Sequence, residues 1–167
     1  MAYWLGSTYD RQSRRALEAS GAVLPYGALV LYLAPRQFAV PTSDISAGNW
    51  TTQVGGTTNL FSVVDESPPD DSDYIRSETG PVNSPVTLAF GTLSTPQSGP
   101  RYIRYRYGKD TAGAQINLTV ELLEGVSVVQ SWSHTDVPLG FTPATQQITN
   151  AISDYGNLRV RFTANQV

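Results

Sequence analysis

Asn157-Leu158-Arg159-Val160-Arg161-Phe162-Thr163-Ala164 is the stretch of this chain that predicts the fold most clearly. Its apolar side chains alternate with arginine and threonine, which is the period of two that a half-buried β-strand requires. We therefore expect Val160 and Phe162 to point into a core and Arg159 and Arg161 to point away from it. The same alternation recurs at residues 101–107 and 116–122.

Further runs of this kind extend over most of the chain after residue 45. The candidate strands lie at about 49–54, 59–64, 73–77, 86–93, 101–107, 115–123, 126–133 and 157–164. Clusters of Pro, Gly and Ser separate them, and Glu124-Gly125 reads as a tight hairpin. Only residues 143–152, with Thr142 as the cap, favour a short helix. The sequence predicts an all-β fold, an antiparallel two-sheet β-sandwich of jelly-roll or Ig-like type.

The first 45 residues differ from the rest and are predicted to form an N-terminal arm. Thr8 is placed to cap a short helix over about 9–20, with Gly21 at its end. The apolar run 28–34 then predicts one strand, which can complete the sheet of this domain or of a neighbour. We expect an arm at 1–45, made of a short helix and one strand, and a β-sandwich domain at 46–167.

The composition narrows the class of protein. The chain has 167 residues, enough for one domain with a real core, and only 15% of them are charged. The net charge of −3 gives no electrostatic case for binding nucleic acid. No cysteine is present, which excludes disulfides and thiolate metal sites. The N-terminus has no signal-peptide pattern, and the run 28–34 is too short to span a bilayer, so we expect a soluble protein made in the cytoplasm and no membrane contact.

Two groups of residues are candidates for sites of chemistry. His134, the only histidine, follows Ser131 and precedes Asp136, but neighbouring residues at a strand end point in different directions, so a catalytic triad is not expected and a histidine at a surface turn is. Five carboxylates lie within residues 65–73, as hard cations prefer, but without the spacing of a calcium loop. The sequence predicts a solvated acidic loop, no metal, no cofactor and no enzyme activity.

Arginine and tryptophan supply the candidate binding residues. The outward arginines, Arg104, Arg106, Arg159 and Arg161, would form one basic stripe if their two strands are neighbours, and a mixed-charge solvent face otherwise. Such a stripe would suit an acidic partner protein. Trp4 and Trp50 are the aromatic residues in segments that suit exposure, whereas Tyr105, Tyr107 and Trp132 are expected in the core.

A scattered pattern of residues between 44 and 164 carries a resemblance to a known family. The pattern consists of Asp44-Ile45-Ser46-Ala47-Gly48-Asn49-Trp50-Thr51, Leu60-Phe61-Ser62-Val63-Val64-Asp65-Glu66, Asp70-Asp71-Ser72-Asp73-Tyr74-Ile75, Arg104-Tyr105-Arg106-Tyr107-Gly108-Lys109 and residues 151–162. It resembles a family of small β-sandwich virion proteins of tailed bacteriophages. The resemblance implies a non-enzymatic structural role in the particle, as a head decoration protein or at a neck or tail accessory position.

Two functions follow as expectations. The first is a virion protein, located in the particle, that attaches to capsid, neck or tail proteins and self-associates through its arm as a homo-oligomer. The second is a carbohydrate-binding or receptor-binding module, because jelly rolls host many sugar sites. A free sugar-binding module does not need the arm, whereas an assembly protein does.

Overall fold

The computed structural model describes residues 37–66, 70–94 and 99–167. Residues 38–167 form one compact unit. The helix predicted at 9–20, the strand predicted at 28–34 and Trp4 lie outside the described residues, so the arm stays a prediction. The described part is all-β, and its one helical element is a short 3-10 helix.

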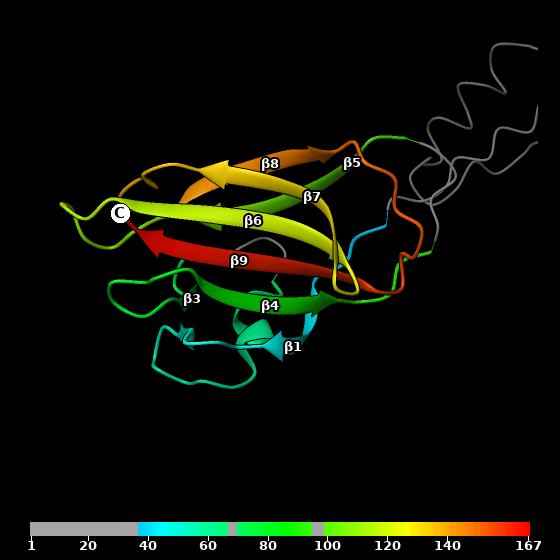
Figure 1. Ribbon diagram of the computed structural model, residues 1–167. Coiled ribbons are helices and arrows are strands. Elements are labelled where there is room, and N and C mark those ends of the chain that lie inside the picture. Colours follow the sequence, from blue (N-terminus) through cyan, green and yellow to red (C-terminus); the bar gives the residue numbers. More distant parts are fainter. Residues whose placement is uncertain (1–36, 67–69, 95–98) are drawn as a thin grey trace, which may run out of the picture. The chain divides into compact units, whose positions relative to one another are not determined.

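The strands and one 3-10 helix follow one another along the chain (Figure 1). They are β1 (Pro41–Ser46), β2 (Thr51–Thr52), β3 (Ile75–Arg76), β4 (Ser84–Phe90), β5 (Arg101–Tyr107), β6 (Ile116–Glu124), β7 (Ser127–His134), β8 (Thr142–Ile148) and β9 (Leu158–Gln166), with the 3-10 helix η1 (Leu60–Val63) between β2 and β3. All the strand pairs within the sheets are antiparallel.

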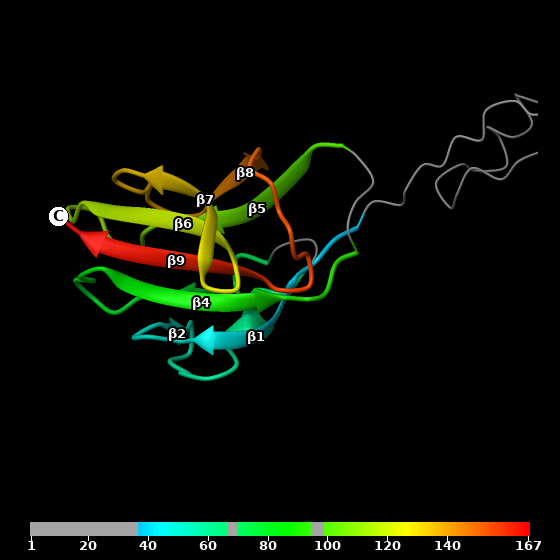
Figure 2. The same cartoon turned by 45° about the vertical axis from the view of Figure 1, so that its right-hand side comes forward.

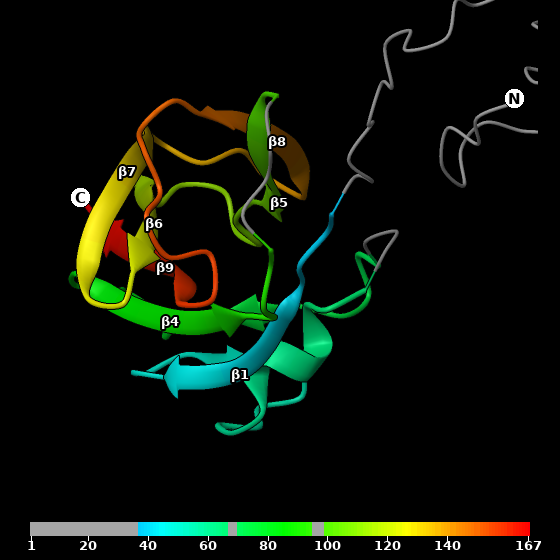
Figure 3. The ribbon, with the colours of Figure 1, turned by 90° about the vertical axis from the view of Figure 1, so that its right-hand side faces the viewer.

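One wide sheet and two narrow ones result. The wide sheet has the order β1-β4-β9-β6-β7, and β2–β3 and β5–β8 form two-stranded sheets. Figure 2 shows β1, β4, β9 and β6 side by side, and Figure 3 shows the β5–β8 ribbon across the core from β4 and β9. This arrangement is consistent with the expected β-sandwich.

The alternation in the C-terminal strand is confirmed. Strand β9 is the middle strand of the wide sheet and pairs with β4 on one side and β6 on the other. Leu158, Val160 and Ala164 are buried, and Phe162 is partly buried against the same core, while Arg159 is only partly buried. A central strand with this pattern brings the apolar rows of three strands together on one face.

The core joins the wide sheet to the ribbon. Val86, Val120 and Val160 from the wide sheet form one buried cluster with Ile103 of β5 and Ile148 of β8. A two-stranded ribbon is marginal alone in water, so the ribbon requires this packing. The wide sheet in turn uses the ribbon to cover its apolar face.

Trp50 corrects one sequence expectation, because it is buried rather than exposed. Its indole Nε1 donates a hydrogen bond to the carbonyl oxygen of Ser84, 3.1 Å away, which satisfies the one polar atom of the ring. The preceding turn also passes close to β4: a Cβ on Gly48 would lie 2.2 Å from the carbonyl oxygen of Pro85. This close approach seats the indole against the start of β4.

Two predicted elements were wrong. Residues 59–64, expected as a strand, hold η1, because the Asp44 carboxylate accepts the backbone N–H groups of Leu60 and Phe61, each at 2.9 Å, and so favours a turn. Residues 143–152, expected as a helix, begin instead with most of β8. Strand β8 pairs with β5 at all seven positions, so tertiary pairing overrides the weak helix signal.

The predicted domain boundary at 45/46 falls inside strand β1. Residues 41–46 pair with β4 at the edge of the wide sheet, with two register shifts. The carboxylate that holds η1 also comes from this strand. The described domain therefore begins several residues before 46.

Leu88→Ala should lower the free energy of unfolding by about 2–5 kcal/mol, because Leu88 is fully buried and its removal leaves a cavity. Val126→Ala is the matched control, since Val126 is 85% exposed at the tip of the β6–β7 hairpin, and it should change stability by less than about 0.5 kcal/mol. Denaturant melts measure both. Equal costs for the two variants would contradict the core described above.

Candidate functional site

The outer face of the β5–β8 ribbon carries two of the predicted binding residues. Strand alternation turns Ile103 into the core and leaves Tyr102, Arg104 and Arg106 exposed. Their register partners on β8 are also exposed, namely Gln147, Thr145 and Pro143. The ribbon thus presents an aromatic ring, two guanidinium groups, an amide, a hydroxyl and a proline ring on one surface.

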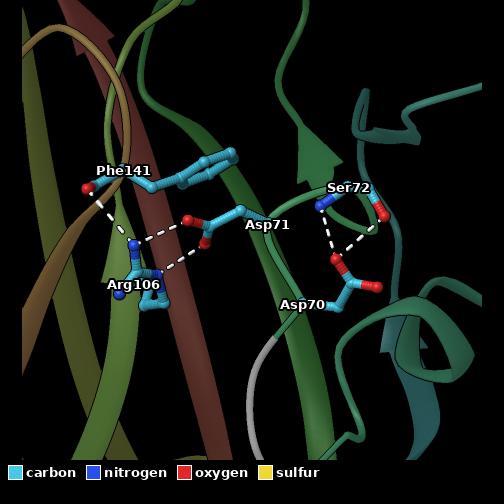
Figure 4. Close-up of polar contacts among 5 residues, drawn as sticks. All are labelled: Asp70, Asp71, Ser72, Arg106 and Phe141. Atoms are coloured by element: carbon cyan, nitrogen blue, oxygen red, sulfur yellow. Dashed lines mark hydrogen bonds and ion pairs between the residues drawn. The ribbon is translucent and has the colours of Figure 1, made fainter.

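Arg106 holds the acidic loop against the ribbon (Figure 4). Its Nε and Nη2 donate to the two carboxylate oxygens of Asp71 at 2.6 and 2.7 Å, and Nη2 also lies 3.4 Å from the carbonyl oxygen of Phe141. Both side chains are partly exposed, so water screens the pair and its contribution to stability is small. The main effect of this ion pair is to hold the segment after residue 69 beside β5. By contrast, Arg104 has no ion pair within the described ranges.

Arg159 and Arg161 lie elsewhere and form no stripe with the β5 arginines. They belong to β9, whose neighbours are β4 and β6, so the condition that the two strands be adjacent is not met. Arg161 Nε donates to Glu121 across the β6–β9 pair at 2.6 Å, and this hydrogen bond raises the pKa of Arg161. The sequence predicts that each arginine points outward, but it does not predict which strands pair and therefore which arginines lie side by side.

The carboxylates between 65 and 73 are largely satisfied by the protein itself. Asp70 Oδ1 accepts from the backbone N and the hydroxyl of Ser72, both at 2.8 Å, and the backbone hydrogen bond is the main reason that the pKa of Asp70 is lowered (Figure 4). Asp73 accepts from Gln53 Nε2 at 2.6 Å. Within residues 37–66, 70–94 and 99–167, no three or more His, Asp or Glu side chains lie close enough together to hold a metal ion.

His134 occupies a different position from the surface turn that was expected. It is the last residue of β7, is partly buried, and its Nε2 lies 2.8 Å from the hydroxyl of Tyr105 on β5. Its ring lies 4.0 Å, centroid to centroid, from that of Tyr107, and Tyr105 also contacts Phe162 edge to face. The cluster of His134, Tyr105, Tyr107 and Phe162 therefore links the wide sheet to the ribbon. This cluster brings together residues of three strands, so their spacing along the chain could not predict it. The sequence predicted only that Tyr105 and Tyr107 point inward.

Burial sets the ionisation of this group. Desolvation raises the pKa of Tyr105 to about 12, so its hydroxyl stays protonated at neutral pH. Desolvation also lowers the pKa of His134, so the neutral imidazole is favoured. A protonated phenol and a neutral imidazole form a stable hydrogen-bonded pair at this contact between the layers.

Side-chain hydrogen bonds connect β7 to the end of β8 and the residues that follow it. Gln130 donates from Nε2 to the carbonyl oxygen of Gln147, and its Oε1 accepts the backbone N–H groups of Thr149 and Asn150. Asn150 Nδ2 in turn donates to the carbonyl oxygen of Val129 at 2.6 Å. These hydrogen bonds connect the wide sheet to the ribbon at a second place, between β7 and the end of β8.

Comparisons with protein-family models, curated proteins and solved structures found no match to this chain. In the described part of the chain, no helix is long and apolar enough to cross a membrane.

Stability should fall as the pH drops through the range in which free histidine titrates, around pH 6.5. The lowered pKa of His134 means that the unfolded chain binds this proton more readily than the folded chain, so acid favours unfolding. His134→Gln should flatten the slope between about pH 7.5 and 5.5. The measurement is the unfolding free energy against pH for both chains, and identical slopes would show that His134 contributes nothing to this dependence.

Proposed function

We propose that this chain is a non-enzymatic virion structural protein of the kind found in tailed bacteriophages. In this proposal it attaches to capsid, neck or tail proteins and joins copies of itself through its N-terminal region. It is made in the cytoplasm of the bacterial host and ends in the particle. The resemblance in residues 44–164 supports the proposal, and so does the distribution of charge and apolar surface over the domain.

The observation that carries the proposal is Phe38. It directly follows the N-terminal region, and 81% of it is exposed. Val40 is exposed beside it, and residues 3–5 and 23–33 contain further large apolar side chains. Exposed apolar surface of this kind is unfavourable in water at about 25 cal/mol per Å². The exposed side chains of Phe38 and Val40 therefore favour burial against another protein.

The charges of the domain fit a protein whose polar groups serve its own fold. Its ion pairs within the described ranges are internal and join Arg106 to Asp71, Lys109 to Asp136 and Arg161 to Glu121. Lys109 is the only lysine of the chain, and its side chain is 15% exposed. These pairs fix loops and strands, and the exposed apolar side chains remain for association.

The finer fold belongs to the same proposal. We assign a two-sheet sandwich of jelly-roll or Ig-like type, preceded by a helix and a strand as an arm. The wide sheet supports this assignment, because β4, β9 and β6 are adjacent in space and not consecutive in sequence, as in Greek-key sandwiches.

Deleting residues 1–36 should leave a folded monomer that no longer associates with the particle or with itself. Deleting residues 1–45 should also lower stability, because it removes all but the last residue of β1 together with Asp44. Light scattering gives the mass of each truncated chain, and denaturant melts give its stability. A truncation at 36 that still forms the full-length oligomer and binds particles unchanged would contradict the attachment role.

Phe38→Ser offers a finer form of the same test. It should weaken co-sedimentation with the particle without changing the melting temperature, since the ring packs little against the domain. Val54→Ser is the matched control, because Val54 is 86% exposed in the loop between β2 and η1. Equal behaviour of the two variants would remove Phe38 from the attachment surface.

A second candidate function, binding of carbohydrate or a host receptor, is favoured by Tyr102. This ring is 50% exposed on the outer face of the ribbon, with Gln147 as its register partner and Arg104 on the same face. Sugars stack on aromatic rings and accept hydrogen bonds from amide and guanidinium groups. If this function holds, Tyr102→Ala should reduce binding to a glycan panel at least tenfold, and an absence of glycan binding by the intact chain would reject it.

A further inference from the structure

We infer that residues 28–34 of a neighbouring copy add to the free edge of β5 as a third strand of the β5–β8 ribbon. This deepens the proposed function and rests on it, since it names the surface through which the N-terminal region joins copies. The partner is thus a second molecule of this same chain, and the recognition is mainly by backbone hydrogen bonds.

The edge of β5 is regular and open. Strand β5 pairs with β8 at all seven positions without a register shift. Within the described ranges, no backbone hydrogen bond joins Arg101–Tyr107 to any segment other than β8. An extended backbone with one unpaired side offers a row of donors and acceptors that another strand can satisfy.

The other sheet edges are less suited to a new strand. Strand β1 begins with Pro41, which lacks a donor, and has two register shifts along its length. Strand β7 has a register shift in its pairing with β6, and the carbonyl oxygen of Val129 is already bonded to Asn150 Nδ2. On β8, Pro143 lacks a donor and the carbonyl oxygen of Gln147 is already bonded. Among the strand edges in the described ranges, the edge of β5 is therefore the one without a register shift, a proline or an already bonded backbone group.

The choice of occupant follows from charge. If a second copy of β5 paired antiparallel about its centre, Arg104 would lie opposite Arg104, and like charges directly opposite are destabilising. The segment Ala28-Leu29-Val30-Leu31-Tyr32-Leu33-Ala34 has no charge to repel. Its six-residue connection, 35–40, spans about 20 Å when extended, which suits a segment passing between adjoining copies.

The pattern of this segment also fits a third strand. Both of its alternating sets of side chains are apolar, as in strands that are covered on both faces. Beside β5, one set continues the inner layer of Ile103 and Tyr105. The other set lies in the outer layer of Tyr102 and Arg104, where it adds apolar surface beside the Tyr102 ring.

The chain has no cysteine, so pairs of introduced cysteines report contacts without background. Arg104→Cys is combined in turn with Val30→Cys, Leu31→Cys and Tyr32→Cys in the full chain, oxidised with a copper catalyst in air, and run on a non-reducing gel. We expect disulfide-linked dimers at alternate positions, with 30 and 32 behaving alike and opposite to 31, because side chains alternate between faces of a strand. The favoured positions should cross-link at least fivefold faster.

Two controls make the outcome decisive. Tyr102→Cys with Gln147→Cys is the positive control, since these residues are paired in the ribbon. Thr42→Cys on β1, combined with the same three positions, tests the competing edge. Cross-links that show no alternation, that form equally well to Thr42→Cys, or that form only within one chain overturn the inference, as does their absence when the positive control succeeds. Particle binding by the same reduced variants is measured separately, so the inference can fail while the proposed function stands.

Discussion

The packing of a two-stranded ribbon against a five-stranded sheet is the constraint on which this structure depends. The ribbon β5–β8 has too little apolar surface to stand alone, and the wide sheet has one apolar face to cover. Ile103 and Ile148 meet Val120 and Val160 in one buried cluster. Hydrogen bonds and ion pairs at the margins of the domain also hold the ribbon against the wide sheet.

Three polar contacts hold the ribbon in place from different sides. His134 bonds to Tyr105 beside the core, Gln130 of β7 donates to the carbonyl oxygen of Gln147 on β8, and Asp71 pairs with Arg106 on the outer face. Each joins segments far apart in the sequence, and the partly exposed pairs contribute modestly by themselves. Together they fix the ribbon against the wide sheet, and in the described residues the side of β5 away from β8 makes no backbone hydrogen bond.

Much of the fold could be predicted from residues with a strong period of two. The predicted strands at 101–107, 115–123, 126–133 and 157–164 match β5, β6, β7 and β9 to within about two residues at each end. The predictions were wrong where contacts with distant residues override the local sequence pattern. A carboxylate on β1 holds residues 60 and 61 in a turn, and pairing with β5 keeps residues 142–148 extended.

The candidate sites were harder to predict for the same reason. The sequence placed Arg104 and Arg161 on outward faces correctly, but only strand pairing shows that they lie on different sheets. The contact of His134 with Tyr105 also depends on pairing between segments that are 29 residues apart. Trp50 was misplaced because its burial relies on one carbonyl oxygen of a strand that begins 34 residues later.

Backbone hydrogen exchange would test most directly the claim that association completes the open edge of β5. In the isolated domain 37–167, amides of Arg101–Tyr107 that point away from β8 should exchange quickly, while those of β9, bonded on both sides, should be protected. In the assembled full-length chain, the β5 amides should become at least tenfold more protected and those of β9 should change little. Equal protection of β5 in the two forms would contradict the account.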